Sequence, residues 1–159
     1  MPARMISYSL VAIQFTALAA LALTGPWLAG NGWLLLEIVA ILLGLWSIVV
    51  MRVGNFNITP NPKQQGVLIQ QGPYRWVRHP MYLALILLAI ALIGYHFTWL
   101  RLVIGLILAV DLVVKLNYEE RLLVRHFSNY EQFRQQTWRL VPYSTVVNLT
   151  DNRFDRYKE

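Results

Sequence analysis

Two long apolar segments dominate the first third of the chain. Residues 6–24 carry no charged side chain, and residues 33–51 carry only one, that of Glu37. About 20 consecutive apolar residues form a helix long enough to cross the hydrocarbon core of a bilayer. Because lipid cannot satisfy backbone N–H and C=O groups, such a segment must satisfy them internally, as a helix does. These segments therefore predict an all-α integral membrane protein.

The first of these segments could instead belong to a cleaved signal peptide. Its apolar run is longer than the roughly 7–15 residues of a signal-peptide core, and Thr24-Gly25-Pro26-Trp27 is a poor cleavage site. We therefore expect a retained span. Two more apolar segments follow at about 81–95 and 97–116, separated by the short break at 94–96. That break predicts an antiparallel helical hairpin, which brings the expected number of transmembrane helices to about four.

Composition agrees with a membrane location and narrows the function. Hydrophobic residues make up 57% of the chain and charged residues 14%, with a net charge of +6. The basic residues lie next to apolar segments, which favours contact with membrane lipids over nucleic acid. The chain has no cysteine and only three scattered histidines, so we expect no disulfide, no cysteine nucleophile and no metal site. Its oligomeric state is left open.

The distribution of basic residues predicts how the chain is oriented. The turn at 25–32 has no charge and the hairpin turn carries only Arg101, whereas Arg4, the 52–79 connector and the C-terminal segment hold nearly all the others. By the positive-inside rule, both termini and the 71–82 motif are expected in the cytoplasm, where a charged, amphipathic segment follows the hairpin. One domain is expected over 1–159: two spans in 1–52, then connector, motif, hairpin and C-terminal cap in 53–143, and a polar tail in 144–159.

Two polar clusters are candidates for chemistry. The first is Gln-Gly-Pro-Tyr-Arg-Trp-Val-Arg-His-Pro-Met-Tyr at 71–82, where Pro80 suits the first turn of a helix. Arg78 and His79 should then lie at a helix N-terminus, which favours anions. The second cluster begins at Glu119-Glu120, after the hairpin. Because the hairpin returns the chain to the same side of the membrane, the two clusters are expected to meet.

Such a site offers a partner for each group of a ligand with a carboxylate, an ammonium and a sulfonium. Arg78 suits the carboxylate and Glu119 the ammonium. A ring of Tyr74, Trp76 or Tyr82 can face the sulfonium by cation–π attraction, worth about 1–2 kcal/mol when desolvated. S-adenosylmethionine carries these three groups, although other zwitterions would fit nearly as well.

The two clusters also resemble a known family. GPYRWVRHPMY, followed by EERLL and a T-x-R-x-x-P ending at Thr137–Pro142, resembles the isoprenylcysteine carboxyl methyltransferase and phospholipid methyltransferase superfamily over roughly residues 60–143. The resemblance implies an integral membrane enzyme with S-adenosylmethionine as methyl donor and S-adenosylhomocysteine as product. The cofactor-binding residues it implies are Gln70, Tyr74, His79, Pro80, Met81, Tyr82 and Glu119, with Arg78 added by the chemistry above. It also implies a basic residue one turn before Glu119, as a contact to the substrate carboxylate, and here this residue is Lys115.

The acceptor is expected to be a lipophilic small molecule or a lipidated substrate. A carboxylate acceptor, such as that of a prenylcysteine, is ionised at neutral pH and needs only a cation to hold it. Lys115, Arg121 and Arg139 are the catalytic candidates for this role. A thiol acceptor would need a base, His79 or His126. Methylation of a phospholipid amine or small thiol, or a non-catalytic scaffold of the same fold, remain alternatives.

Some charged residues have a simpler interpretation. Glu37 is expected near the interface, hydrated or paired with a neighbouring helix. Asp111 is expected to pair with Lys115 four residues on, and Glu120 to lie on a solvated face, paired with Arg121 or Arg125.

Overall fold

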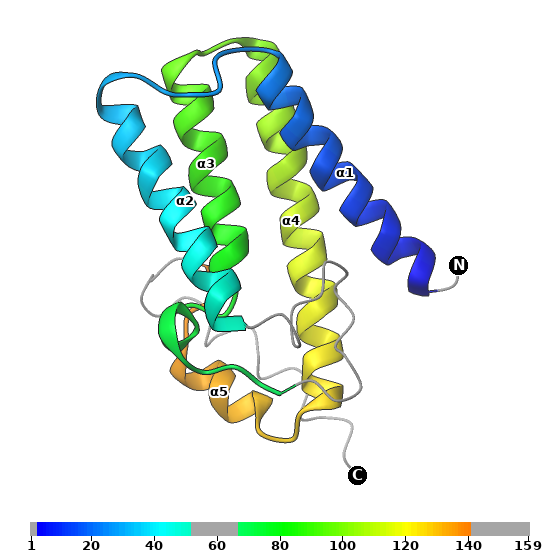
Figure 1. Ribbon diagram of the computed structural model, residues 1–159. Coiled ribbons are helices and arrows are strands. Elements are labelled where there is room, and N and C mark those ends of the chain that lie inside the picture. Colours follow the sequence, from blue (N-terminus) through cyan, green and yellow to red (C-terminus); the bar gives the residue numbers. More distant parts are fainter. Residues whose placement is uncertain (1–2, 52–66, 141–159) are drawn as a thin grey trace.

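The computed structural model describes residues 3–51 and 67–140, and all of its regular elements there are helical (Figure 1). The elements are α1 (Ala3–Leu23), α2 (Asn31–Met51), a short 3-10 helix η1 (Gly72–Arg75), α3 (Pro80–Tyr95), α4 (Trp99–His126) and α5 (Tyr130–Gln136). The four apolar segments of the sequence correspond to α1 to α4. The all-helical fold class is thus confirmed for the described residues.

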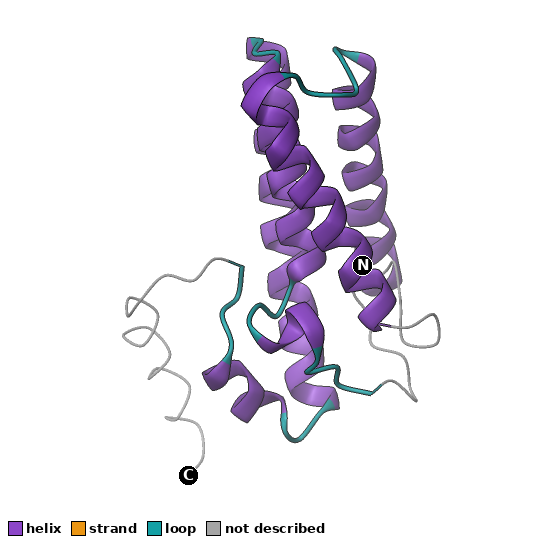
Figure 2. Ribbon diagram, turned by 60° about the vertical axis from the view of Figure 1, so that its left-hand side comes forward, coloured by secondary structure: helices purple, strands orange, loops and turns teal. Residues whose placement is uncertain are grey.

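The four long helices form one bundle. α2 packs along α3 and α1 against α4, while α3 and α4 form the expected hairpin. Figures 1 and 2 show α1 crossing α4 obliquely, with α5 lying beyond the end of the bundle where α3 begins. The core between the helices is built from small and branched side chains, namely Ala17, Leu21, Ala89, Leu108 and Leu112.

Two of the described helices are long and apolar enough to cross a membrane, over Met5–Leu23 and Asn31–Met51. α3 is a shorter apolar helix. On α2 the large apolar side chains of Leu35, Leu42 and Val49 point outward and are 68%, 60% and 73% exposed. Such a surface is unfavourable in water and suits a hydrocarbon environment, because lipid removes it from water.

α4 does not end where its apolar sequence ends. It begins after Thr98, whose side chain accepts a hydrogen bond from the Arg101 N–H, and runs as one helix to His126. Glu119 and Glu120 therefore lie on a rigid extension of the last apolar helix. The extension carries the acidic pair to the end of the bundle that α5 covers with its buried residues Tyr130 and Phe133.

The opposite end of the bundle holds two buried charges. Glu37 is only 3% exposed, and its Oε2 accepts a hydrogen bond from the Ala29 N–H at 2.7 Å. The expectation of a hydrated or helix-paired carboxylate is therefore wrong. The loop before α2 folds back over the first turn of that helix, so Glu37 satisfies a backbone donor that would otherwise be buried without a partner.

Arg101 is the second buried charge, and its side chain is fully enclosed. Its guanidinium donates to the carbonyl of Leu21 at 3.0 Å and to that of Leu92 at 2.9 Å. Helix C-termini leave carbonyls without intrahelical partners and carry a negative partial charge. Arg101 thus joins the ends of α1 and α3 to the start of α4.

Candidate functional site

The motif at 71–82 folds into a compact turn before α3. Gly72 has a φ of +57°, a value that favours glycine, and η1 follows at once. η1 buries Tyr74, whose hydroxyl donates to the Ser47 carbonyl of α2 at 3.5 Å. Burial, with a smaller effect from Glu119, raises the pKa of the Tyr74 hydroxyl, so it stays protonated. α3 then begins at Pro80, as predicted.

Glu120 is the centre of an ion-pair cluster that joins three segments of the chain. Its Oε1 lies 2.9 Å from Arg78 Nε and 3.4 Å from His79 Nε2, and its Oε2 lies 2.8 Å from Arg139 Nη2. Burial alone would raise the pKa of Glu120, but the hydrogen bond with His79 and the two guanidinium charges outweigh it and hold the pKa at about 2. The expected solvated face paired with Arg121 or Arg125 is therefore wrong.

Arg78 is committed to this cluster. It also donates to the Thr137 carbonyl at 2.9 Å and to the Arg134 carbonyl. Nearby, its backbone N–H bonds to the Trp138 carbonyl at 2.8 Å, and the Trp138 N–H bonds to the Trp76 carbonyl at 2.9 Å. Arg78 thus ties the motif to the segment after α5 through its Nε and Nη1 groups. Its expected contact with a ligand carboxylate stays a prediction.

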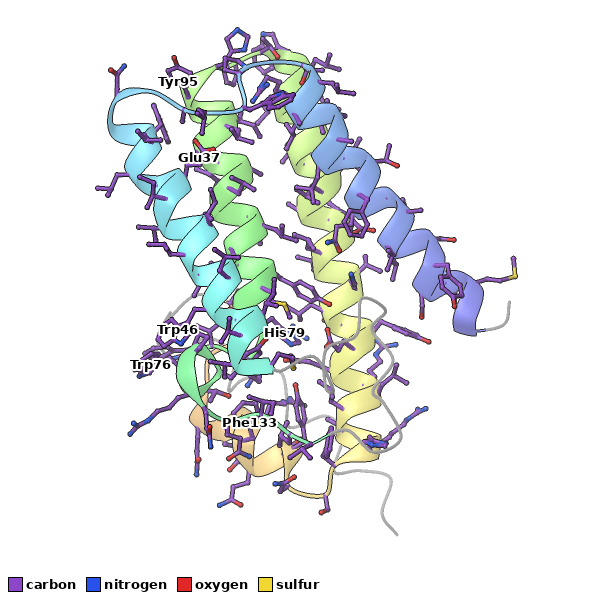
Figure 3. The ribbon with its side chains drawn as sticks, in the orientation of Figure 1. Glu37, Trp46, Trp76, His79, Tyr95 and Phe133 are labelled. Carbon is purple, nitrogen blue, oxygen red and sulfur yellow. The ribbon has the colours of Figure 1, made fainter. Side chains whose placement is uncertain are left out.

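The two sequence clusters do meet, at Tyr82 and Glu119. The Tyr82 hydroxyl donates to Glu119 Oε2 at 2.6 Å, and His79 Nδ1 lies 3.7 Å from the same oxygen. The His79 and Tyr82 rings stack with an interplanar angle of 1° and centroids 5.4 Å apart. The Glu119 side chain is 26% exposed, so it is accessible to a ligand. Figure 3 places His79 at the end of α3 away from Tyr95 and Glu37.

Lys115 lies one turn deeper on α4 than Glu119 and is 3% exposed. Its Nζ donates to Gln14 Oε1 of α1 at 2.7 Å and lies 5.4 Å from the centroid of the Tyr82 ring. The expected pairing with Asp111 is wrong, since neither Asp111 carboxylate oxygen has a hydrogen-bond partner among the described residues. Lys115 turns toward α1, where Gln14 offers an amide oxygen inside the bundle.

The remaining predicted site residues differ in how buried they are and in what they bind. Met81 is half-buried in the first turn of α3, whereas Gln70 is exposed and Arg121 is exposed with no ion pair in the described part of the chain. Arg139 is bound by Glu120 and by Asn117 Oδ1 at 2.7 Å. Pro142, the last residue of the T-x-R-x-x-P ending, lies outside the described residues.

Sequence reasoning missed Gln14, which bonds to Lys115 across the bundle. A lone amide in the middle of a charge-free apolar segment was an available signal, because polar side chains inside a membrane helix face the bundle and find partners there. Sequence reasoning also missed that Glu120 is buried and pairs with Arg78, His79 and Arg139. The anion site expected at the start of α3 stays a prediction, and within that first turn the Tyr82 N–H already bonds to the His79 carbonyl at 3.1 Å.

The fold and the site define a helical membrane protein with a polar, aromatic-lined site at one end of its apolar helices. Residues 33–125, more than half of the chain, match the isoprenylcysteine carboxyl methyltransferase family, and the chain belongs to that family. The match covers nearly all of α2 and of α4 and the whole of η1 and α3, and it includes both Tyr82 and Glu119. Comparison with curated proteins and with solved structures gave no match. Family membership makes this protein a membrane methyltransferase.

Proposed function

We propose that the protein transfers a methyl group from S-adenosylmethionine to a lipophilic acceptor, at the site formed by His79, Tyr82 and Glu119. The observation that carries the proposal is the 2.6 Å hydrogen bond from Tyr82 to Glu119, which joins two motifs 37 residues apart. Both side chains come from rigid helices, as a site that must fix two reactants requires.

The side chains present fit much of the donor. The accessible Glu119 carboxylate suits an ammonium group, and the stacked rings of His79 and Tyr82 offer aromatic faces to a sulfonium. Glu120 and two backbone carbonyls bind the Nε and Nη1 groups of Arg78, so a donor carboxylate would have to bind its Nη2 group. The first turn of α3, with Pro80 and Met81, and the buried Tyr74 would complete the wall. When bound, the donor supplies an electrophilic methyl carbon on sulfur.

Lys115 is the best-placed of the three candidate cations for an acceptor carboxylate. It is next to Tyr82, whereas Arg139 is bound to Glu120 and Arg121 points away into the exposed surface. A carboxylate acceptor, as in a prenylcysteine, needs no base. A bond from its oxygen to the methyl carbon would form as the methyl–sulfur bond of the donor breaks, with the electron pair left on sulfur. Lys115 would orient the carboxylate, and the surrounding helices would exclude water.

We also propose that α1 to α4 all cross the membrane, with the His79 end in the cytoplasm. The described end near His79 carries Arg75, Arg121, Arg125, Arg134 and Arg139, while the opposite end has the buried Arg101. This asymmetry follows the positive-inside rule. The soluble donor would then enter from the cytoplasm and the lipophilic acceptor from the bilayer.

Binding of S-adenosylhomocysteine to the purified full chain in detergent tests the donor site. We expect micromolar affinity by calorimetry, lost by about tenfold or more in Tyr82→Phe and Glu119→Gln, because each removes one side of the same charge-assisted hydrogen bond. Arg121→Gln is the matched control and should bind normally. Unchanged binding in both site variants would show that the donor binds elsewhere, and no binding to wild type would favour a non-catalytic scaffold.

Transfer of labelled methyl groups tests the acceptor. A methyl ester is cleaved by mild base, whereas an N-methyl or S-methyl product survives. Base-labile label on a lipophilic acid is the expected result, and base-stable label would point to the amine or thiol alternatives.

A further inference from the structure

Gln14 has no role in the site described so far, yet it is a buried amide in the apolar helix α1. It is 8% exposed and belongs to the face of α1 that is buried in the bundle, together with Ser7, Leu10, Ala17 and Leu21. A polar side chain inside a membrane helix is costly, so it usually has a partner and a function. Gln14 also lies outside residues 33–125, so the family match assigns nothing to it.

The partner of Gln14 is Lys115, across the bundle on α4. Gln14 Oε1 accepts a hydrogen bond from Lys115 Nζ at 2.7 Å. A lysine ammonium has three N–H donors, and the amide uses one of them without adding a negative charge. The contact therefore fixes the position of the ammonium and leaves its positive charge in place.

Lys115 also has an alternative partner on its own helix. Asp111 lies four residues earlier, a spacing at which opposite charges pair, and the two side chains are close enough to interact electrostatically. Both oxygens of Asp111 nevertheless lack a hydrogen bond within the described residues, whereas Lys115 Nζ bonds to Gln14. Gln14 thus competes with Asp111 for the ammonium. An ion pair with Asp111 would neutralise Lys115, and a ligand carboxylate would then have to displace a buried counter-charge.

The position that Gln14 gives to Lys115 is beside the proposed site. Lys115 Nζ lies 5.4 Å from the centroid of the Tyr82 ring. Tyr82 is half-buried, and its hydroxyl donates to the accessible Glu119. A ligand that reaches the Tyr82 ring is therefore within reach of a cation that forms no ion pair in the described part of the chain.

We propose that Gln14 is a positioning residue for the acceptor. Its amide oxygen holds the Lys115 ammonium beside Tyr82 and away from Asp111, so that this cation stays available to an anionic acceptor. The inference rests on the proposed function and adds to it a residue of α1 that takes no direct part in the transfer. A precise site requires such support, because a contacting side chain must be held in one rotamer by its neighbours.

Binding of two matched probes to the full chain in nanodiscs of zwitterionic lipid tests this role. 3-(Dodecylthio)propanoic acid carries a carboxylate, and 3-(dodecylthio)propan-1-ol has the same tail without the charge. Wild type should bind the acid about tenfold more tightly than the alcohol. Gln14→Leu should weaken binding of the acid about tenfold and leave binding of the alcohol unchanged, because Lys115 then pairs with Asp111. Phe15→Leu changes an exposed residue of the same helix and, as the control, should alter neither affinity.

A second change separates positioning from packing. In an Asp111→Asn background Lys115 has no carboxylate to pair with on its own helix, so adding Gln14→Leu should weaken binding of the acid by about twofold or less. Loss of packing alone would give the same loss in both backgrounds. Gln14→Glu keeps the side-chain shape and serves if Gln14→Leu does not fold. It should also weaken binding of the acid about tenfold, because its carboxylate neutralises Lys115.

Turnover gives an independent readout. With a lipophilic acid as acceptor, Gln14→Leu should raise KM about tenfold and change kcat by less than about twofold, because the donor site is untouched. S-adenosylhomocysteine binding, measured in parallel, should be normal in every variant. Its absence from wild type would count against the proposed function and would leave the probe comparison intact.

The inference would be overturned by equal affinity of wild type for the acid and the alcohol, or by an equal loss of both in Gln14→Leu. An equal loss of acid affinity in the wild-type and Asp111→Asn backgrounds would assign Gln14 a packing role only. Unchanged binding of the acid by Gln14→Glu would show that the charge of Lys115 does not reach the ligand.

Discussion

At the scale of single residues, Glu120 holds together the segments that form the candidate site, although Glu120 itself is not one of the proposed contacts to the ligand. Its carboxylate binds Arg78 and His79, which come just before α3, and Arg139, which comes after α5. Glu119 is left as the accessible partner of Tyr82. The sequence analysis identified the acidic pair and assigned Glu119 to the ligand, but it placed Glu120 on a solvated face, whereas Glu120 is buried. Adjacent helical residues point about 100° apart, so which one faces inward depends on the rotation of α4, which is set by its packing against other helices.

Glu120 also makes the site sensitive to acid. Its pKa is about 2 in the folded protein against an ordinary value of 4.5. A lowered folded-state pKa means that its stabilisation is fully present above pH 4.5 and declines as the pH falls toward 2. The shift corresponds to roughly 3 kcal/mol. We expect the protection factors of amides in α5 and in the paired segments 76–78 and 137–139, which compare each exchange rate with the intrinsic rate at the same pH, to fall over that pH window.

Glu120→Gln should remove this pH dependence and raise the exchange rates of the same amides at neutral pH, because Arg78 and Arg139 lose their common counter-charge. Glu131→Gln is the control, since Glu131 is 54% exposed and its contact with Arg134 is a surface pair. Protection factors in Glu120→Gln that still fall with pH as in wild type would assign the effect to another group.

At the scale of elements, the apolar lengths in the sequence predicted the bounds of α1, α2 and α3 and the start of α4 to within a few residues, because lipid-compatible helices require uninterrupted apolar runs. They did not predict that α4 continues past its apolar segment to His126. They did not predict that α1 packs against α4 and α2 along α3. Helix pairing depends on small contact features, such as Gly25 beside Arg101 or Gln14 beside Lys115, that have no periodic signature. Nor did they reveal that Arg101, in the sequence a lone charge near a turn, is a buried cap for two helices.

The Arg101 cap yields a prediction about how three helices are held together. A Cβ added to Gly25 would collide with Arg101 Nη1, so Gly25→Ala must displace the guanidinium from the carbonyls of Leu21 and Leu92. We expect Gly25→Ala and Arg101→Met each to lower stability by about 2–4 kcal/mol, the cost of disrupting a buried charged hydrogen-bond network. The double variant should lose much less than the sum, because both changes break the same contacts. Additive losses in melting experiments in detergent would show that Gly25 and Arg101 act separately.

At the scale of the whole molecule, the bundle has two chemically different ends, and the helices between them present an apolar outer surface. The end with His79 and α5 carries accessible charge and the candidate site, while the far end buries its charged residues Glu37 and Arg101 against backbone groups. That difference is what a membrane enzyme needs if its donor is water-soluble and its acceptor lipophilic. It is also the physical basis of the orientation proposed above, since basic loops are retained in the cytoplasm.

The orientation can be measured without background, because the chain contains no cysteine. Single cysteines are introduced at Gln132 on α5, at Leu28 in the far loop and at Leu42 on the outward face of α2, all exposed in the isolated chain. With a membrane-impermeant maleimide on intact bacterial cells, we expect Leu28→Cys to react, and Gln132→Cys to react only in inverted vesicles. Leu42→Cys should react neither in intact cells nor in inverted vesicles until detergent is added. The reason is that lipid covers this face of α2, which is exposed in the isolated chain. Labelling of Gln132→Cys in intact cells would show that the orientation is opposite to the one proposed. Rapid labelling of Leu42→Cys in membranes would mean that α2 does not face lipid. The three sites together therefore test both the direction and the depth of the bundle, on which access of donor and acceptor from opposite phases depends.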